Sequence, residues 1–511
     1  MRYVEHPLIK KGSIESRLYQ EAILGQAAVT DLLCVLPTGL GKTPIAIVLS
    51  VYRLEKYPGS KILVLAPTKP LIEQHFNSFR KAINLPETEF ALVTGMVKPE
   101  KRRELYRKAR LIFATPQTIR NDLERGEIDL SDFSLVVFDE AHHSIGDYAY
   151  PYIAKEYLKV AKNPRILGLT ASPGGTKEKI REIMGNLGIN RVEIRTESDA
   201  DVEPWVKKKR VEWVYVELPE KFTEVGKRLR KAYRKRLEKL KKMGFSKPAS
   251  LVTKKDLLEL QKKLQETEGY RKFWGVSLVS QAIKIEHALG LLETQGIGSL
   301  RSYFARLSKD GTRSSRSILK DRDAERAMVL ADRLGGEGYK HPKMSKLCEI
   351  IRSEISKNPS SKIIVFANYR EMVREIVATL SEIEGVRPAE FMGQREGMTQ
   401  KQQKERIQEF REGKYNVLVT TSIGEEGIDI PEMELAVFYE PVPSEIRSIQ
   451  RRGRVGRTKV GRIIILMAKR TRDEAYYWTA HRKERLMKKV LYELKGERKV
   501  RGKQSSLSEF G

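Results

Sequence analysis

Cys34-Val-Leu-Pro-Thr-Gly-Leu-Gly-Lys-Thr43 joins two apolar runs, Leu32 to Leu36 and Pro44 to Val51. This order predicts a buried strand, a glycine-rich turn and a helix. In that arrangement the glycines let backbone N–H groups curl around a phosphate, and the helix N-terminus adds partial positive charge. The stretch therefore predicts a nucleotide-binding loop inside an α/β fold.

The glycine-rich turn supplies the predicted nucleotide-binding residues, which are Thr38, Gly39, Leu40, Gly41, Lys42 and Thr43. Lys42 would reach the β- and γ-phosphates of ATP, and the Thr43 hydroxyl would bind Mg²⁺. Leu36 stands where the general pattern G-x-x-x-x-G-K-[ST] has its first glycine. Gln20, upstream in a predicted helix, carries a donor and an acceptor together and would bind adenine; a surface glutamine is the alternative.

The composition is that of a large protein with excess positive charge. The chain has 511 residues, enough for roughly two to four domains. Its formal net charge of +29 predicts a polyanionic partner, nucleic acid before membrane. A basic surface that is only solvated, as in thermophiles, is the alternative. Cys34 and Cys348 suggest neither a disulfide framework nor a metal site, and no secretion signal or membrane span is visible.

Short apolar runs alternate with amphipathic segments over the first third of the chain, which predicts a parallel α/β sheet. After the strand before the phosphate loop, the predicted strands are Lys61 to Ala66, Ala91 to Thr94, Leu111 to Ala114, Leu135 to Phe138 and Arg165 to Leu169. Ligands bind beyond the carboxyl ends of such strands. Polar signatures stand at these ends: Pro67-Thr68, Gly95, Thr115-Pro-Gln117, Asp139-Glu140 and Thr170-Ala-Ser172.

Two acids at a strand tip suit a metal ion and a water molecule. Asp139 would hold Mg²⁺, and Glu140 would orient or deprotonate the attacking water. Surface ion pairs are the alternative. His142 and His143 would form hydrogen bonds across a domain cleft, with metal ligation as the alternative. Thr170 and Ser172 would relay the nucleotide state by switching hydrogen bonds, with ordinary turn chemistry as the alternative.

The middle of the chain is helical and basic. Between Lys221 and Lys247 there are twelve Lys or Arg and two Glu. Val276 to Leu292 predicts a buried helix, Arg301 to Arg322 a basic loop, and Val211 to Leu218 a strand of the same unit. The basic residues expected to contact nucleic acid are Arg230, Lys231, Arg234 and Lys235. A helical spacer with a solvated basic face is the alternative.

Strands and helices alternate again after Gly335-Gly-Glu-Gly338. The predicted strands are Lys362 to Ala367, Val417 to Thr420, Leu435 to Tyr439 and Ile463 to Met467. This part has no phosphate loop of its own. Arg454 and Arg457 lie at i and i+3 of a predicted helix and would stabilise transition-state charge on the γ-phosphate as arginine fingers, and Gln450 could touch that phosphate or its water. A basic helix that contacts only nucleic acid is the alternative.

The ordered motifs Gly-Leu-Gly-Lys-Thr43, Ala-Pro-Thr68, Thr-Pro-Gln117, Asp-Glu-Ala-His142 and Thr-Ala-Ser172 resemble the first motor domain of superfamily 2 helicases. With the helical insertion and Gln-Arg-Arg-Gly-Arg-Val-Gly-Arg457, the pattern resembles the DEAH-box Hef helicases of archaea and their relatives FANCM and Mph. The resemblance implies two RecA-like parallel-sheet motor domains with an all-helical domain between them. It divides the chain into residues 1–204, 205–335, 336–480 and 481–511, the last a basic helix and tail.

The same resemblance implies an ATP- and Mg²⁺-dependent helicase or translocase acting on branched DNA, in DNA repair or at stalled forks. Gly427 and Asp429 would contact nucleotide and ribose. The nucleic-acid contacts of the motor domains would be Pro67, Thr68, Gly95, Thr115, Asn368, Arg370, Gln394 and Thr420. We expect a cytoplasmic, nucleoid-associated protein of archaeal and thermophilic type. Hef proteins also carry a nuclease domain, which this sequence lacks.

Two other functions stay open from the sequence. Dicer and the innate-immune RNA sensors share the layout, so a double-stranded RNA helicase is the near alternative. A non-catalytic nucleic-acid-binding scaffold is the second, and the presence of Lys42, Asp139, Glu140, Arg454 and Arg457 argues against it. At the C-terminus, Gln504, Leu507 and Phe510 resemble a sliding-clamp-binding motif without its second aromatic residue.

Overall fold

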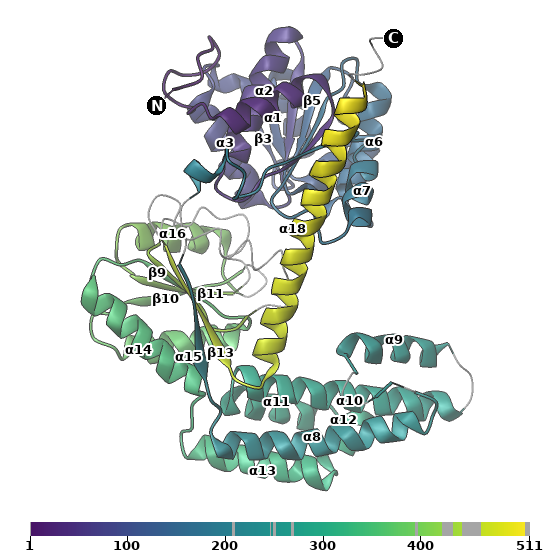
Figure 1. The fold of residues 1–511 in the computed structure, drawn as a ribbon, viewed down its shortest axis with the longest axis vertical. Coiled ribbons are helices and arrows are strands. Elements are labelled where there is room, and N and C mark those ends of the chain that lie inside the picture. Colours follow the sequence, from purple (N-terminus) through teal and green to yellow (C-terminus); the bar gives the residue numbers. More distant parts are fainter. Residues whose placement is uncertain are drawn as a thin grey trace.

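Two parallel β-sheets, a helical bundle and one long helix make up the chain (Figure 1). The computed structural model describes residues 2–206, 210–245, 247–248, 252–266, 270–393, 397–421, 433–441 and 461–505. Several predicted site residues lie outside the described residues; these are Gln394, Gly427, Asp429, Gln450, Arg454, Arg457, Leu507 and Phe510. Within the described helices, none combines the length and apolar composition needed to cross a membrane.

The first sheet is all-parallel. Its strand order is β3 (Phe90–Val93), β4 (Leu111–Ala114), β2 (Lys61–Leu65), β5 (Phe133–Phe138), β6 (Ile166–Thr170), β1 (Leu32–Val35) and β7 (Arg191–Ile194). Apolar clusters cover both faces, which is why the strands are continuous apolar runs. The α-helices are α1 (Leu18–Val29), α2 (Lys42–Lys56), α3 (Lys69–Ala82), α4 (Pro99–Lys108), α5 (Pro116–Glu124), α6 (Ala149–Val160) and α7 (Lys177–Asn186).

The second sheet contains a strand that the sequence analysis assigned to the insertion. The strand order is β10 (Pro388–Phe391), β11 (Val417–Thr420), β9 (Ile363–Phe366), β12 (Leu435–Phe438), β13 (Arg462–Ala468) and β8 (Arg210–Val216). β8 pairs with β13 in parallel, from Arg210 opposite Arg462 to Val216 opposite Ala468. The boundary expected at residue 205 is therefore wrong, because β8 belongs to the second sheet. The helices here are α14 (Pro342–Lys357), α15 (Arg370–Ser381) and α16 (Gln400–Arg411).

The insertion is a bundle of helices with its own core. Its helices are α8 (Glu220–Lys241), α9 (Lys254–Gln265), α10 (Tyr270–Thr294), α11 (Ile297–Lys309), α12 (Arg313–Leu319) and α13 (Arg322–Gly336). The basic loop expected over Arg301 to Arg322 is wrong. Leu300, Phe304 and Leu307 recur at helical spacing and pack into the core of the bundle, so this segment is helical.

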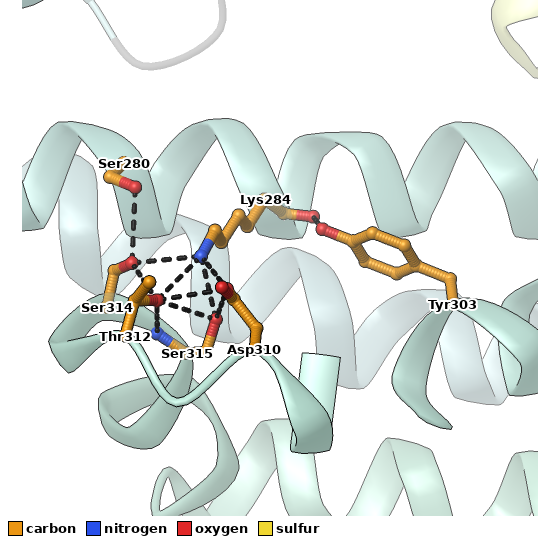
Figure 2. A network of polar contacts seen from close by, with 7 residues as sticks. All are labelled: Ser280, Lys284, Tyr303, Asp310, Thr312, Ser314 and Ser315. Carbon is orange, nitrogen blue, oxygen red and sulfur yellow. Dashed lines mark hydrogen bonds and ion pairs between the residues drawn. The ribbon is translucent and has the colours of Figure 1, made fainter. Parts of the chain in front are cut away.

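A polar network fixes the turn between α11 and α12 (Figure 2). The Lys284 ammonium on α10 donates to the hydroxyls of Thr312, Ser314 and Ser315 at 3.0, 3.0 and 2.7 Å. It also pairs with the Asp310 carboxylate at 2.5 Å. One side chain therefore ties the turn to the longest helix of the bundle.

The long helix α18 (Arg472–Ser505) connects the parts of the molecule (Figure 1, yellow). At its start, Asp473 forms a fully buried ion pair with Lys343 of α14, and Arg472 pairs with Glu286 of α10 at 2.7 Å. Further along, Met487, Val490 and Leu491 join the apolar core of the first sheet. The helix predicted from the tail composition is present, but a division at residue 480 falls inside it.

Candidate active site

The phosphate loop leaves β1 and enters α2 through two left-handed glycines, Gly39 at φ +83° and Gly41 at φ +86°. The positive φ of Gly41 strains any other residue there, and a Cβ at this position would lie 2.2 Å from the amide nitrogen of Gln20, whose side chain would have to shift. Lys42 opens α2, and its ammonium donates to the Leu36 carbonyl at 3.1 Å. That bond holds the lysine over the loop.

A second helix supports the loop from outside. The Tyr19 hydroxyl and the Gln20 amide of α1 both donate to the Leu40 carbonyl, at 2.7 and 3.2 Å. Gln20 is buried here, so at least part of its side chain holds the loop; adenine binding by Gln20 remains a prediction. The sequence did not single out Tyr19, since an aromatic residue in an amphipathic helix carries no signal beyond burial.

The acids after β5 lie in a histidine-rich environment. The Asp139 carboxylate contacts the His75 ring at 2.7 Å, and both side chains are buried. Glu140 has a left-handed backbone at φ +49°. Such strained conformations of residues other than glycine are found mainly at functional sites. Burial alone would raise the pKa of Glu140, but the hydrogen bond from His142 and the charges of His142 and Lys42 hold that pKa below its usual range. A lowered pKa keeps the carboxylate ionised, and a carboxylate can orient the attacking water by accepting its hydrogen bond.

The donor set suits a magnesium nucleotide. Thr43 supplies a hydroxyl and Asp139 a carboxylate, both hard oxygen ligands of the kind Mg²⁺ prefers. Lys42 supplies a positive charge for phosphate, and the left-handed backbone at Gly39 and Gly41 is of the kind that lets a loop turn its N–H groups toward a phosphate. Nucleotide, metal and water residues therefore come from loops at one edge of the first sheet.

Hydrogen bonds lead from Glu140 to α18. His142 contacts Glu140 at 3.3 Å and the Thr170 hydroxyl at 3.2 Å. Thr170 accepts from the Ser172 backbone N–H at 3.1 Å, and the Ser172 hydroxyl donates to the Met487 sulfur at 3.2 Å. These contacts of His142 lie within the first domain rather than across the cleft. The two residues predicted to relay the nucleotide state are thus joined to a helix that starts in the second domain.

The candidate nucleic-acid edge of the first sheet is partly hollow. Gly95 lines a cavity of about 410 Å³ together with Lys98, Arg102, Thr118, Asn121 and Arg125. Arg102 is held by Asp122 at 2.7 Å and by the Val97 carbonyl at 2.6 Å. Asn121 and Arg125 are exposed and were missed by the sequence analysis. Their one signal is position, since Asn121 lies on the helix that follows Thr115 and Arg125 comes directly after that helix.

One residue of the second domain that was expected to contact nucleic acid is buried. Thr420 is fully buried, and its hydroxyl donates to the Thr421 carbonyl at 3.1 Å. The structure therefore contradicts a nucleic-acid contact through this side chain. Arg370 begins α15, and the Asn368 backbone N–H donates to the Glu440 carboxylate at 2.8 Å.

The four basic residues expected to contact nucleic acid from α8 are Arg230, Lys231, Arg234 and Lys235. Three of them approach acids of the bundle. Arg230 pairs with Glu293 at 2.7 Å, and Lys235 pairs with Asp323 at 2.6 Å. Lys231 lies 3.7 Å from the same aspartate, and the Lys235 hydrogen bond lowers the pKa of Asp323. Arg234 alone of the four has no ion pair among the described residues. The other three stay 42–65% exposed in their ion pairs, so a nucleic-acid contact through these residues remains a prediction.

The arginines of α12 are placed differently. Arg313, Arg316 and Lys320 are exposed and have no ion pair with any described residue. The turn before them is the one tied to α10 by Lys284 (Figure 2). The positive charge of these three side chains is therefore not offset by an ion pair within the described residues.

The fold and the site together define a two-domain motor of the helicase class. The nucleotide-binding loop lies in the first sheet domain, and the basic helical bundle stands in the chain between β8 and the other strands of the second sheet. Residues 17–180 match the family "DEAD/DEAH box helicase", residues 342–459 "Helicase conserved C-terminal domain", and residues 221–335 "Putative ATP-dependent RNA helicase, helical bundle". The chain belongs to the DEAD/DEAH box helicases, a family of ATP-dependent enzymes, and to their Hef, FANCM and Mph1 branch.

The solved structure of the Pyrococcus furiosus Hef helicase domain is 48% identical, with a TM-score of 0.73, over 93% of this chain and 100% of that one. A Methanocaldococcus jannaschii protein described as "Putative ATP-dependent RNA helicase" is 44% identical over 96% of this chain and 62% of its own length. The "ATP-dependent DNA helicase fml1" of Schizosaccharomyces pombe is 33% identical over 97% and 61%. The chain thus spans less than two thirds of these curated relatives.

Proposed function

We propose that the chain is the motor of an ATP-dependent DNA helicase or translocase that unwinds or remodels branched DNA, such as forks and Holliday junctions, in repair or at stalled forks. The observation that carries the proposal is the convergence of Lys42, Asp139 and Glu140 at one sheet edge, joined through Thr170 and Ser172 to a helix from the second domain. A basic protein with DNA as its substrate would be located in the cytoplasm, in association with the nucleoid.

In the proposed cycle, Lys42 and the loop N–H groups bind the phosphates, and Thr43 and Asp139 hold the metal ion. Mg²⁺ neutralises charge on the phosphates when it is bound. Glu140 orients the attacking water. Arg454, Arg457 and Gln450 complete the site from the second domain, and Gly427 and Asp429 contact the nucleotide.

Closure of the two domains would be transmitted to bound nucleic acid through the loops that contact it and through α18. Pro67, Thr68, Gly95 and Thr115 stand at the carboxyl ends of neighbouring strands, where Asn121 and Arg125 extend the same edge. Asn368 and Arg370 of the second domain, and Gln394, would bind the backbone beyond the cleft. Such contacts are made to phosphates, so binding should depend on salt more than on sequence.

The insertion gives a prediction about DNA affinity. Reversing the charge of Arg313, Arg316 and Lys320 to Glu should weaken fork binding and reduce the slope of log affinity against log salt by roughly 3, because each lost phosphate contact removes about 0.9 from the slope. The measurement is fluorescence anisotropy of a labelled fork from low to high salt.

A matched control for this experiment reverses Lys155, Lys159 and Lys162, which change the net charge equally. Lys162 pairs with Asp132 just before β5, and Lys159 lies near it at the end of α6, so these residues are at the opposite edge of the first sheet. An equal loss of affinity in both triple variants would show that overall charge, and not the α12 surface, binds the fork.

RNA is the second candidate substrate, because the names of the M. jannaschii relative and of the bundle family include RNA. We expect fork DNA to stimulate ATP hydrolysis and to displace duplex RNA in competition. The assay compares ATPase rates with single-stranded, duplex, forked and four-way DNA and with duplex RNA. Stimulation by duplex RNA alone would replace the DNA proposal by the RNA one.

A sliding clamp and a nuclease domain stay as further proposed partners. Gln504 falls at the end of α18, and Leu507 and Phe510 follow outside the described residues. A clamp peptide there would lie beyond the segment that packs on the first domain. Clamp binding would be tested by removing residues 504–511.

A further inference from the structure

His75 is a buried residue of α3 that the proposed mechanism leaves without a role. Its Nε2 lies 2.7 Å from Oδ2 of Asp139, and the two side chains are 4% and 7% exposed. Its other ring nitrogen, Nδ1, is buried without a hydrogen-bond partner among the described residues. A carboxylate only accepts hydrogen bonds, so the proton is assigned to Nε2, and this N–H donates to the Asp139 carboxylate.

This contact has the form of an outer-shell interaction at a metal site. Ligating carboxylates are commonly hydrogen-bonded by a neighbour that sets their orientation. Asp139 has one oxygen on His75, which leaves its second oxygen, Oδ1, as the one that can be presented to a metal ion. Because α3 packs on the sheet through the fully buried Ile72 and Phe79, the ring has little freedom to move away.

The same helix begins at the nucleic-acid edge. Thr68 is the residue before α3, and Lys69 is its first residue. His75 follows six residues later, or about 9 Å along a helix at 1.5 Å per residue. Between them, Glu73 pairs with Lys404 of α16 in the second domain at 2.7 Å. One rigid helix thus meets the nucleic-acid loop, the other motor domain and the predicted metal ligand.

We propose that His75 is a positioning residue that orients the Asp139 carboxylate for the metal ion and, through α3, makes that orientation depend on nucleic acid bound at Pro67 and Thr68. This inference rests on the proposed function, because it takes Asp139 as a metal ligand and the start of α3 as a DNA contact. It adds a direct route from the DNA contact to the nucleotide site.

The first test measures binding of a fluorescent ADP analogue to the full chain, with Mg²⁺ and with EDTA. In His75→Ala, the gain in affinity that Mg²⁺ provides should shrink by roughly tenfold, the lower end of what outer-shell changes cost. Affinity in EDTA should stay that of the parent. His75→Gln, whose amide can donate to Asp139, should restore most of the gain. An undiminished Mg²⁺ gain in His75→Ala would overturn the positioning role.

The second test repeats the titration with saturating forked DNA. The factor by which DNA changes affinity for the Mg²⁺ nucleotide is the coupling between the two sites. It should move toward one in His75→Ala and be retained in His75→Gln. An unchanged factor in His75→Ala would overturn the coupling role.

Controls separate this inference from fold and function. His6→Ala removes an exposed histidine–glutamate contact to Glu55 at 3.1 Å and should behave as the parent. Thermal unfolding checks each variant, and His75→Met, of similar size without an N–H, replaces the alanine variant if that one does not fold. If the parent itself shows no Mg²⁺-dependent nucleotide binding, the proposed function fails; if the parent shows it and the variants match it, only the role of His75 fails.

Discussion

Replacing Glu140 by Gln should lower kcat for ATP hydrolysis by roughly 10²- to 10⁴-fold, the range for a group that acts on the attacking water. ATP affinity should change little, because Lys42 and the loop bind the phosphates. Glu140 has a left-handed backbone and contacts His142, and the lowered pKa of its carboxyl group favours the negatively charged form. Glutamine keeps the shape and removes the charge that orients the water.

The experiment measures single-turnover hydrolysis and ATP binding separately, so that the two effects can be told apart. Glu156→Gln makes the same change at an exposed ion pair on α6 and serves as the control. A Glu140→Gln enzyme that hydrolyses ATP at the parent rate would remove Glu140 from the catalytic site. A parallel loss of affinity would assign it to nucleotide binding instead.

Replacing Arg454 by Ala should lower kcat by roughly 10³- to 10⁵-fold, as expected for an arginine finger, with a much smaller change in ATP affinity. The reason is that a guanidinium aimed at the γ-phosphate acts on charge that grows in the transition state. The loss should also remove DNA stimulation, because closure of the second domain would no longer complete the site. ATPase assays with and without forked DNA measure both.

Arg452→Ala is the matched control, because in the helix predicted from the sequence Arg452 and Arg454, two positions apart, would point to different sides. It should weaken DNA binding while leaving the turnover of DNA-saturated enzyme near that of the parent. Equal losses of turnover and ATP affinity in Arg454→Ala would indicate a binding role. Loss of DNA affinity without loss of turnover would make this segment a nucleic-acid helix, the alternative left open by the sequence.

The parallel-sheet architecture could be predicted because its signals are local. An apolar strand, a turn and an amphipathic helix follow one another in the chain, and the order repeats, so the all-parallel sheets agree with the expectation. The strand at Arg210–Val216 was also recognised as a strand. The sheet to which this strand belongs was not predicted. Its pairing with β13 joins segments 252 residues apart (462 − 210), and neither segment carries a sequence signal that indicates the other.

The site divides in the same way. Lys42, Thr43, Asp139 and Glu140 stand in short motifs whose chemistry is carried by adjacent residues. His75 meets Asp139 across 64 residues. The sequence around a single histidine on an apolar helix face does not indicate a contact with that aspartate. Only the packing of α3 on the sheet brings the two together.

Charge gives the clearest contrast between the two kinds of information. Composition alone implied a polyanionic partner, and that inference required no structure. Which basic residues are paired was decided by packing: α13 supplies Asp323 to Lys235, whereas Arg313 and Arg316 of α12 are exposed and have no ion pair among the described residues. The sequence by itself determined the phosphate loop, the acids and the sheet type, because these depend on neighbours in the chain. Tertiary structure decided the partners of β8, His75, Ser172 and the insertion's basic residues, because contacts between distant segments depend on how helices and sheets pack.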